Sequence, residues 1–288
     1  MKRKGRLWQV DQAGNLINEG DYRLIDPIFK PLIKDVIRAY TRNIEADLHS
    51  IYLTGSIARG LGIVGQSDLD VIGIIDHTRD PDMVMQDWLE IEEDALTAQY
   101  ANLVSQVQFD LFPPGAVYGT GEEFSIGAFI IRTHSACIWG PDLANTLPDF
   151  NINDQQTRLG IANDDIVQIK EEIEEALADL HDDTSPANAA YWSRRISKNI
   201  LRTGFAFVMT NRAIHSRDPD IAYQYFASAY PDQAPDMAKA LSFVEDPTTN
   251  TQELILFLQS HGQWIIDQAD QWHDKYNPDR ELALPLNK

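Results

Sequence analysis

Segments with strand character occur only in the first part of this chain of 288 residues and end near Phe112. Alternating or continuous apolar runs predict strands over about 50–54, 69–75 and 104–112. Apolar residues at three- and four-residue spacing predict helices over about 26–48, 81–103 and 124–138. Asp26 is a suitable N-cap for the first of these helices, with Pro27 at its first position. The pattern favours a small mixed sheet flanked by helices.

The character of the sequence changes after a loop rich in Pro, Asp and Asn that covers residues 140–154. Beyond this loop the spacing predicts helices alone, over about 158–180, 186–211, 220–245 (a pair) and 251–276. A loop of this composition between two different patterns is typical of a domain boundary. We therefore expect an α+β chain with two domains, a mixed-sheet domain at 1–152 and an all-helical bundle at 153–288.

Composition limits the classes of partner. Hydrophobic residues make up 43% of the chain, enough for a large core, and the formal net charge is −20. Because such a charge repels the phosphate backbone, long nucleic acid is an unfavourable partner. The same charge attracts small cations, although it also serves solubility alone. One cysteine and no apolar run of membrane-spanning length lead us to expect a soluble, cytoplasmic protein.

The stretch YLTGSIARGLGIVGQSDLDVIGII, from Tyr52 to Ile75, contains two apolar runs joined by a glycine-rich loop. A strand that ends at Gly55-Ser56 and turns into a helix exposes backbone N–H groups, and glycine allows a phosphate to approach closely. The Ser56 hydroxyl adds a donor, and Arg59 adds a charged one. We include Ser67, at the other end of the loop, in this predicted phosphate-binding site.

Two aspartates, Asp68 and Asp70, stand at the start of the next predicted strand and share one of its faces. Beside a triphosphate these carboxylates would repel one another unless Mg²⁺ lies between them. Asp110, in VQFDLF on the following strand, supplies a third carboxylate as metal ligand or base. Two ions are usual in phosphoryl-type transfers. The alternative interpretation makes the first two a polar strand start and Asp110 a solvent-facing residue.

Together these motifs resemble the nucleotidyltransferase superfamily to which DNA polymerase beta belongs. The resemblance covers about 51–112: Gly-Ser, then eleven residues, then Asp-Leu-Asp, then an apolar-Asp-apolar strand. It implies that Gly55 and Ser56 hold ATP or another NTP, that Asp68, Asp70 and Asp110 bind two Mg²⁺ ions, and that a nucleoside monophosphate passes to a hydroxyl with release of pyrophosphate.

The order of domains is similar to that of aminoglycoside adenylyltransferases of the streptomycin/spectinomycin type, and HSACIWGPDL from His134 echoes a stretch near their domain junction. One departure concerns the acceptor, because Gln108 occupies the position of the glutamate base of those enzymes. The expected acceptor is a small hydroxylated molecule, with an aminoglycoside-like class first among the candidates. A protein or tRNA end modified by a toxin-like relative, and a catalytically silent nucleotide-binding module, stay open as alternatives.

A basic stripe lies on the predicted helix 186–211, where Arg194, Lys198 and Arg202 follow one another at four-residue intervals. Arg194 and Lys198 are candidates for binding the β- and γ-phosphates. The competing interpretation pairs this stripe with the acidic helix that precedes it.

Overall fold

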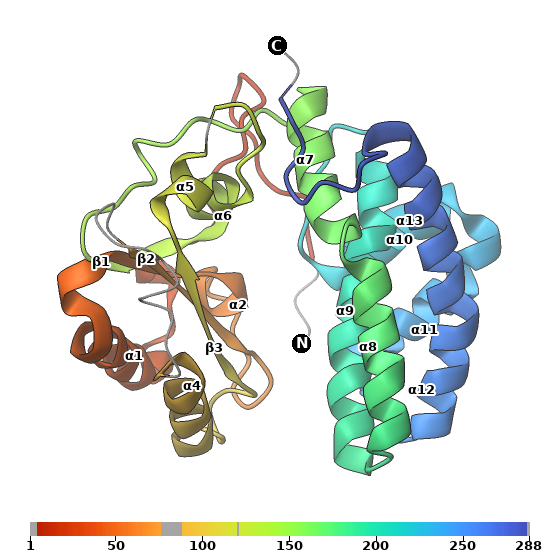
Figure 1. Ribbon diagram of the computed structural model, residues 1–288, viewed down its shortest axis with the longest axis horizontal. Helices are drawn as coiled ribbons and strands as arrows, with labels where there is room; N and C mark the ends of the chain where they lie inside the picture. The colour runs from red at the N-terminus through yellow and green to blue at the C-terminus, as the bar shows by residue number, and fades with distance from the viewer. Residues whose placement is uncertain (1–4, 76–87, 120, 287–288) are drawn as a thin grey trace. The chain divides into compact units, whose positions relative to one another are not determined.

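The computed structural model describes residues 5–75, 88–119 and 121–286. They form two compact units (Figure 1), one made of residues 11–150 and the other of residues 151–286 together with 5–10. The first unit is mixed and the second contains helices alone, so the predicted α+β class is confirmed. The segment 5–10, which the sequence analysis assigned to the first domain, packs with the helical unit. There the Trp8 N–H donates to the His215 carbonyl (2.8 Å).

Four strands make up the sheet of the first unit, in the order β3-β2-β1-β4. β1 (Leu48–Leu53) is antiparallel to both β2 (Leu69–Ile75) and β4 (Ala136–Trp139), whereas β2 and β3 (Val107–Phe112) are parallel. The mixed sheet agrees with the sequence-based expectation.

The predicted helix 124–138 is wrong in its last part. The helix α6 (Ile126–His134) ends before Ser135, whose extended backbone leads into β4. Residues 132–135 are polar, but β4 has only four residues, too few for strand alternation to distinguish it from a continuation of the helix.

The other helices of this unit flank the sheet. The first predicted helix consists of a 3₁₀ turn (Pro27–Phe29), α1 (Lys30–Ile44) and a second 3₁₀ turn (Glu45–Asp47), and the Asp26 carboxylate accepts the Ile28 N–H as a cap (2.9 Å). Three further helices are α2 (Gly55–Ala58), α4 (Trp88–Gln99) and α5 (Pro114–Tyr118). The part of the predicted helix 81–103 that precedes Trp88 lies outside the described residues.

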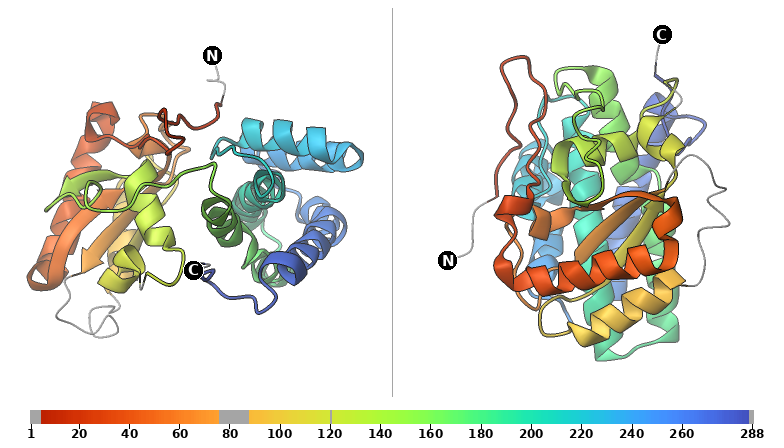
Figure 2. Two further views of the ribbon diagram at one scale, coloured as in Figure 1. Left: turned by 90° about the horizontal axis from the view of Figure 1, so that it is seen from above. Right: turned by 90° about the vertical axis from the view of Figure 1, so that its left-hand side faces the viewer.

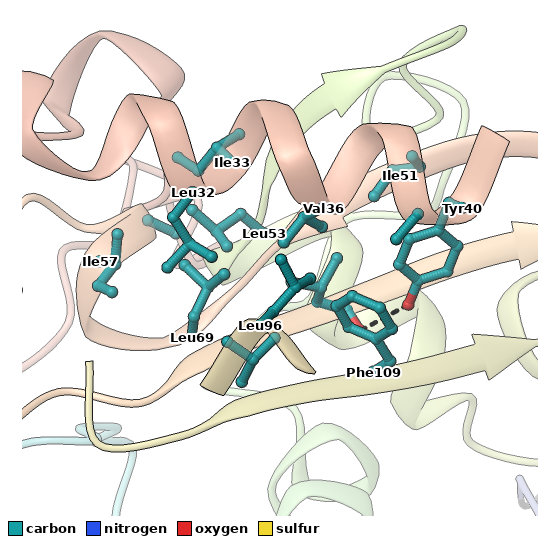
Figure 3. Close-up of a cluster of buried hydrophobic side chains, with 14 of the residues drawn as sticks. Leu32, Ile33, Val36, Tyr40, Ile51, Leu53, Ile57, Leu69, Leu96 and Phe109 are labelled. Carbon is teal, nitrogen blue, oxygen red and sulfur yellow. Dashed lines mark hydrogen bonds between the residues drawn. The ribbon is translucent and has the colours of Figure 1, made fainter. Parts of the chain in front are cut away.

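Both α1 and α4 contribute to the core on one face of the sheet (Figure 3). Leu32, Val36 and Tyr40 of α1 meet the odd-numbered residues of β2 and β3, such as Leu69 and Phe109. Strand side chains alternate, so the even-numbered residues of β2 and β3 face the opposite side. This alternation assigns the polar residues of the two strands to the face away from α1.

The outer edge of β3 is covered by side chains of α4. The Val107 N–H donates to Thr97 Oγ1 (2.9 Å), and the Phe109 N–H donates to Glu93 Oε1. Two acceptors one helical turn apart thus serve two N–H groups two residues apart on the strand. The side chains of Thr97 and Glu93 therefore satisfy N–H groups on the edge strand β3 that would otherwise be able to pair with another chain.

The helical unit is arranged around α9 (Pro186–Met209), which packs against α7, α8, α10 and α11 (Figure 2). The other helices are α7 (Gln155–Ile166), α8 (Ile169–Asp182), α10 (Pro219–Ala229), α11 (Ala234–Glu245), α12 (Thr251–Phe257), a π-helical turn (Leu258–Gly262) and α13 (Gln263–Tyr276). Among the described residues, no helix combines the length and apolar character needed to cross a membrane.

Two of the predicted helices of this unit are divided. The single helix predicted over 158–180 is two helices, which are separated by a turn at residues 167–168. Ile166 and Ile169, on either side of this turn, are both buried. The helix predicted over 251–276 contains the π-helical turn. Apolar spacing continues across both irregularities, so it does not reveal them.

Candidate functional site

The turn after β1 brings Gly55 against Asp70. The Thr54 N–H donates to the Asp70 carbonyl (2.9 Å), which joins the end of β1 to the start of β2. Gly55 has a φ of +73°, and a β-carbon added to it would collide with Oδ2 of Asp70. No side chain caps the N-terminus of α2 at this point. A residue without a side chain is therefore required both by the backbone conformation and by the carboxylate beside it.

The two predicted serines close the loop between β1 and β2. Ser56 Oγ and Ser67 Oγ share a hydrogen bond of 3.0 Å, and Ser67 Oγ accepts the Ile63 N–H at 2.9 Å. The Leu61 N–H donates to the Ser56 carbonyl (2.8 Å). Ser67 is buried, so its hydroxyl serves this loop, while Ser56 stands in the first turn of α2 next to Gly55.

Arg59 is committed to an ion pair inside the first unit. Its guanidinium donates to Glu19 Oε2 at 3.1 Å through Nη2 and at 3.2 Å through Nε, and the two side chains are only 7% and 4% exposed. This ion pair favours a structural role for Arg59, and its role in binding a phosphate stays a prediction. A buried carboxylate requires a cation beside it, and Arg59 meets that requirement for Glu19.

Register places the predicted carboxylates of β2 and β3 on one face. Asp70 pairs with Gln108, and Asp110 lies two residues further along β3, opposite Ile72. By strand alternation Asp70, Gln108 and Asp110 all face away from α1. Asp68 immediately precedes β2 and is partly buried.

Among these groups, Asp110 has a shifted pKa. Although the residue is open to solvent, enough protein surrounds its carboxyl group that desolvation raises the pKa. Within the part of the chain that the structure describes, no three His, Cys, Asp or Glu side chains are gathered so that they could hold a metal ion. The binding of two ions by Asp68, Asp70 and Asp110 stays a prediction.

Two residues near Asp110 escaped the sequence analysis. The hydroxyl of Tyr40 donates to the Asp110 carbonyl at 3.0 Å and to the Val71 carbonyl at 3.3 Å. Glu93 lies on the other side of β3, where burial and then the charge of Asp110 raise its pKa. Tyr40 has a helical apolar spacing, so the sequence indicated a core residue and gave no signal of the strand that its hydroxyl reaches.

The basic stripe belongs to the helical unit. Arg194 and Lys198 are partly buried on α9, and their role in binding phosphate stays a prediction. The pKa of Glu172 on α8 is raised by burial and lowered in part by the nearby charge of Arg202. The proximity of Arg202 to Glu172 favours the interpretation in which Arg202 pairs with the acidic helix α8.

A cluster of charges that the sequence analysis missed lies in the same unit. The guanidinium of Arg217 contacts Asp165 at 2.6 Å and Asp164 at 3.8 Å. Burial and repulsion by Asp165 raise the pKa of Asp164 to about 6. These aspartates are adjacent on α7, and their partner lies more than fifty residues away, so local spacing gives no sign of the cluster.

No protein-family model matches the chain, and no curated protein matches it. Among solved structures, one that is similar is spectinomycin adenyltransferase AAD(9) from Enterococcus faecalis with ATP and spectinomycin. Its TM-score to this chain is 0.46 at 13% sequence identity, covering 82% of this chain and 98% of that chain.

Proposed function

We propose that this protein is a nucleotidyltransferase that moves a nucleoside monophosphate, AMP from ATP in the simplest case, onto a hydroxyl of a small molecule. The observation that carries the proposal is the contact between the Gly55 turn and the Asp70 carboxylate, with Asp110 on the same face of the neighbouring strand. A helix start without a side-chain cap, beside a carboxylate, is suited to a nucleoside triphosphate and a divalent cation.

Each residue has a separate task in this proposal. The absent side chain of Gly55 makes room for the Asp70 carboxylate, the first backbone N–H groups of α2 would bind a phosphate, and Ser56 adds its hydroxyl. Asp110 accepts the proton of the attacking hydroxyl. Arg59 is left out because of its ion pair with Glu19, and the phosphate-binding role of Arg194 and Lys198 stays a prediction from the sequence.

The carboxylates fit a magnesium ion by their donor chemistry. Mg²⁺ is commonly bound by one or two carboxylates and completes its coordination with water and phosphate oxygens. Asp70 and Asp110 would hold it, with Asp68 beside them, and the bound ion would offset the charge of the phosphates. The parallel register of β2 and β3, together with strand alternation, puts Asp70 and Asp110 on one face, which supports this proposal.

The net charge of −20 favours a cationic acceptor, such as a hydroxylated polyamine or an aminoglycoside-like molecule. A protein or tRNA end has no specific structural observation in its favour. The acceptor panel should therefore begin with small cationic polyols.

The test uses ATP labelled at the α-phosphate, Mg²⁺ and the acceptor panel, with pyrophosphate release as readout. The Asp70→Asn variant should lose at least about 100-fold in rate. The matched control is Asp149→Asn, because Asp149 is an exposed carboxylate that pairs with Arg132. Full pyrophosphate release by Asp70→Asn would contradict the assigned site. ATP binding in calorimetry without turnover on any acceptor would favour the silent module.

A further inference from the structure

Tyr40 carries a buried hydroxyl whose two acceptors belong to the strands of the proposed site. The side chain is 0% exposed, and its hydroxyl reaches the carbonyl oxygens of Asp110 on β3 and Val71 on β2. Figure 3 shows this side chain reaching from α1 toward the sheet, with a dashed line from its hydroxyl. A single phenol thus ties α1 to both strands whose other face carries the carboxylates.

The ring of Tyr40 is fixed by a complementary gap in the sheet. A β-carbon on Gly73 would collide with this ring, so only glycine admits it at that point of β2. Phe109 and Trp88 contact the ring at centroid distances of 4.8 Å and 5.4 Å. Because the ring is packed in this way, it cannot change its rotamer, and the position of its hydroxyl along β3 is fixed.

The backbone around Asp110 is held from both sides. Tyr40 donates to the carbonyl of Asp110, while Glu93 on α4 accepts the N–H of Phe109, one residue earlier. The strand itself has six residues and lies at the edge of the sheet, where it has one neighbouring strand. These side-chain bonds therefore replace part of the support that a second strand would give.

We propose that Tyr40 is a positioning residue for Asp110. Its hydroxyl fixes the position of Asp110 along β3, and with it the carboxylate on the face shared with Asp70, two residues beyond the position that pairs with Asp70. This inference rests on the proposed function. Removal of the hydroxyl leaves the ring and its packing in place, and lets the backbone of Asp110 shift. A shift of about 1 Å in a reacting group can lower a rate by about 100-fold.

The variant that tests this role is Tyr40→Phe, with Tyr52→Phe as its matched control. Tyr52 is also fully buried in the same sheet, and its hydroxyl makes two bonds, to the Asp142 carboxylate (3.1 Å) and from the Leu143 N–H (2.5 Å). Both variants lose one buried hydroxyl with two partners, but the partners of Tyr52 are not attached to Asp110. Similar shifts in melting temperature are expected for the two.

Two readouts separate positioning from general destabilisation. The kcat of Tyr40→Phe should fall by about 10-fold or more while the KM for ATP changes little, and Tyr52→Phe should keep the wild-type kcat. Binding of Mn²⁺ in the presence of a non-hydrolysable ATP analogue, followed by electron paramagnetic resonance, should weaken only in Tyr40→Phe. Glu93→Ala, which releases the same backbone from its other side, supplies a second variant and should reproduce the fall in kcat.

Equal kcat and equal Mn²⁺ affinity in Tyr40→Phe, Tyr52→Phe and the wild type would overturn the positioning role while leaving the proposed function intact. A wild-type protein that neither transfers the nucleotide nor binds Mn²⁺ with the analogue would instead overturn the proposed function, and this inference with it.

Discussion

The carboxylate of Asp70 occupies the space that a side chain on Gly55 would need, at a point where the backbone also has a positive φ of +73°. We therefore predict that Gly55→Ala is damaging for two separate reasons. The left-handed backbone costs an alanine about 1–2 kcal/mol, and the methyl group displaces Asp70 from the turn. Transfer activity should fall far more than stability, because Asp70 is a member of the proposed site.

Gly121 provides the control for this prediction. It has a similar φ of +76°, but a β-carbon there would meet no atom within 4 Å. Gly121→Ala should show the backbone cost alone, about 1 kcal/mol in chemical denaturation, with unchanged activity. Equal activity in Gly55→Ala and Gly121→Ala would show that the contact with Asp70 has no functional role.

Arg59 and Glu19 allow a second prediction, which separates a structural from a phosphate-binding role. Arg59→Ala leaves the Glu19 carboxylate buried without its guanidinium partner. The free energy of unfolding should drop by about 3–5 kcal/mol, measured by urea denaturation. The double variant Arg59→Met, Glu19→Gln removes both charges and should recover most of this loss.

The double variant also tests nucleotide binding. Since we assign Arg59 a structural role, the KM for ATP of the double variant should match that of the wild type. A large rise in this KM, in a variant of restored stability, would return Arg59 to the phosphate site that the sequence predicted.

Local signals predicted the elements with clear boundaries. The strand predicted over 69–75 is β2 to the residue, and α9 begins where Pro186 was predicted to start a helix, with the Ser185 side chain accepting the Asn188 N–H. In both cases the physical cause, an apolar run or a cap, lies within a few residues. By contrast β4 has only four residues, too few for strand alternation to distinguish it from a continuation of α6.

The contacts that determine the site are distant in sequence. The Tyr40 hydroxyl and the Asp110 carbonyl are 70 residues apart, and Arg59 and Glu19 are 40 apart. Spacing identified Asp70 and Asp110 as candidates, because strand alternation is a local rule. It could not indicate that Arg59 turns to Glu19 or that Tyr40 reaches β3, because those outcomes depend on how the elements pack.

Thr97 carries a third prediction, about the edge of the sheet. Thr97→Ala leaves the buried Val107 N–H without its side-chain acceptor, which should cost about 1–3 kcal/mol of stability. Thr97→Ser keeps the hydroxyl and should stay close to the wild type. The comparison is made by urea denaturation, together with light scattering as a measure of edge-to-edge association. Identical stability of the alanine and serine variants would refute a role for this bond.

The last prediction concerns His261, which lies in the π-helical turn of the helical unit. The side chain is 1% exposed, its ring stacks on Trp264 at a centroid distance of 5.8 Å, and neither ring nitrogen has a hydrogen-bond partner among the residues that the structure describes. Burial lowers its pKa from 6.5 to about 4, and the charge of Asp236 opposes this only in part. The folded state therefore favours the neutral form of the His261 ring over the protonated form.

The sign of the pH effect follows from this shift. Between pH 6.5 and about 4 the unfolded chain binds a proton at this histidine and the folded chain does not, so stability falls as the pH falls. Going from pH 7.5 to 5 should remove about 2 kcal/mol through this residue. In His261→Phe, which keeps an aromatic ring among Phe226, Phe257 and Trp264, the free energy of unfolding, measured by urea denaturation, should change less between these pH values, by that amount. If the stability of the variant and of the wild type changed with pH in parallel, the pKa of His261 would be the same in the folded and the unfolded chain. Burial would then have no effect on its protonation.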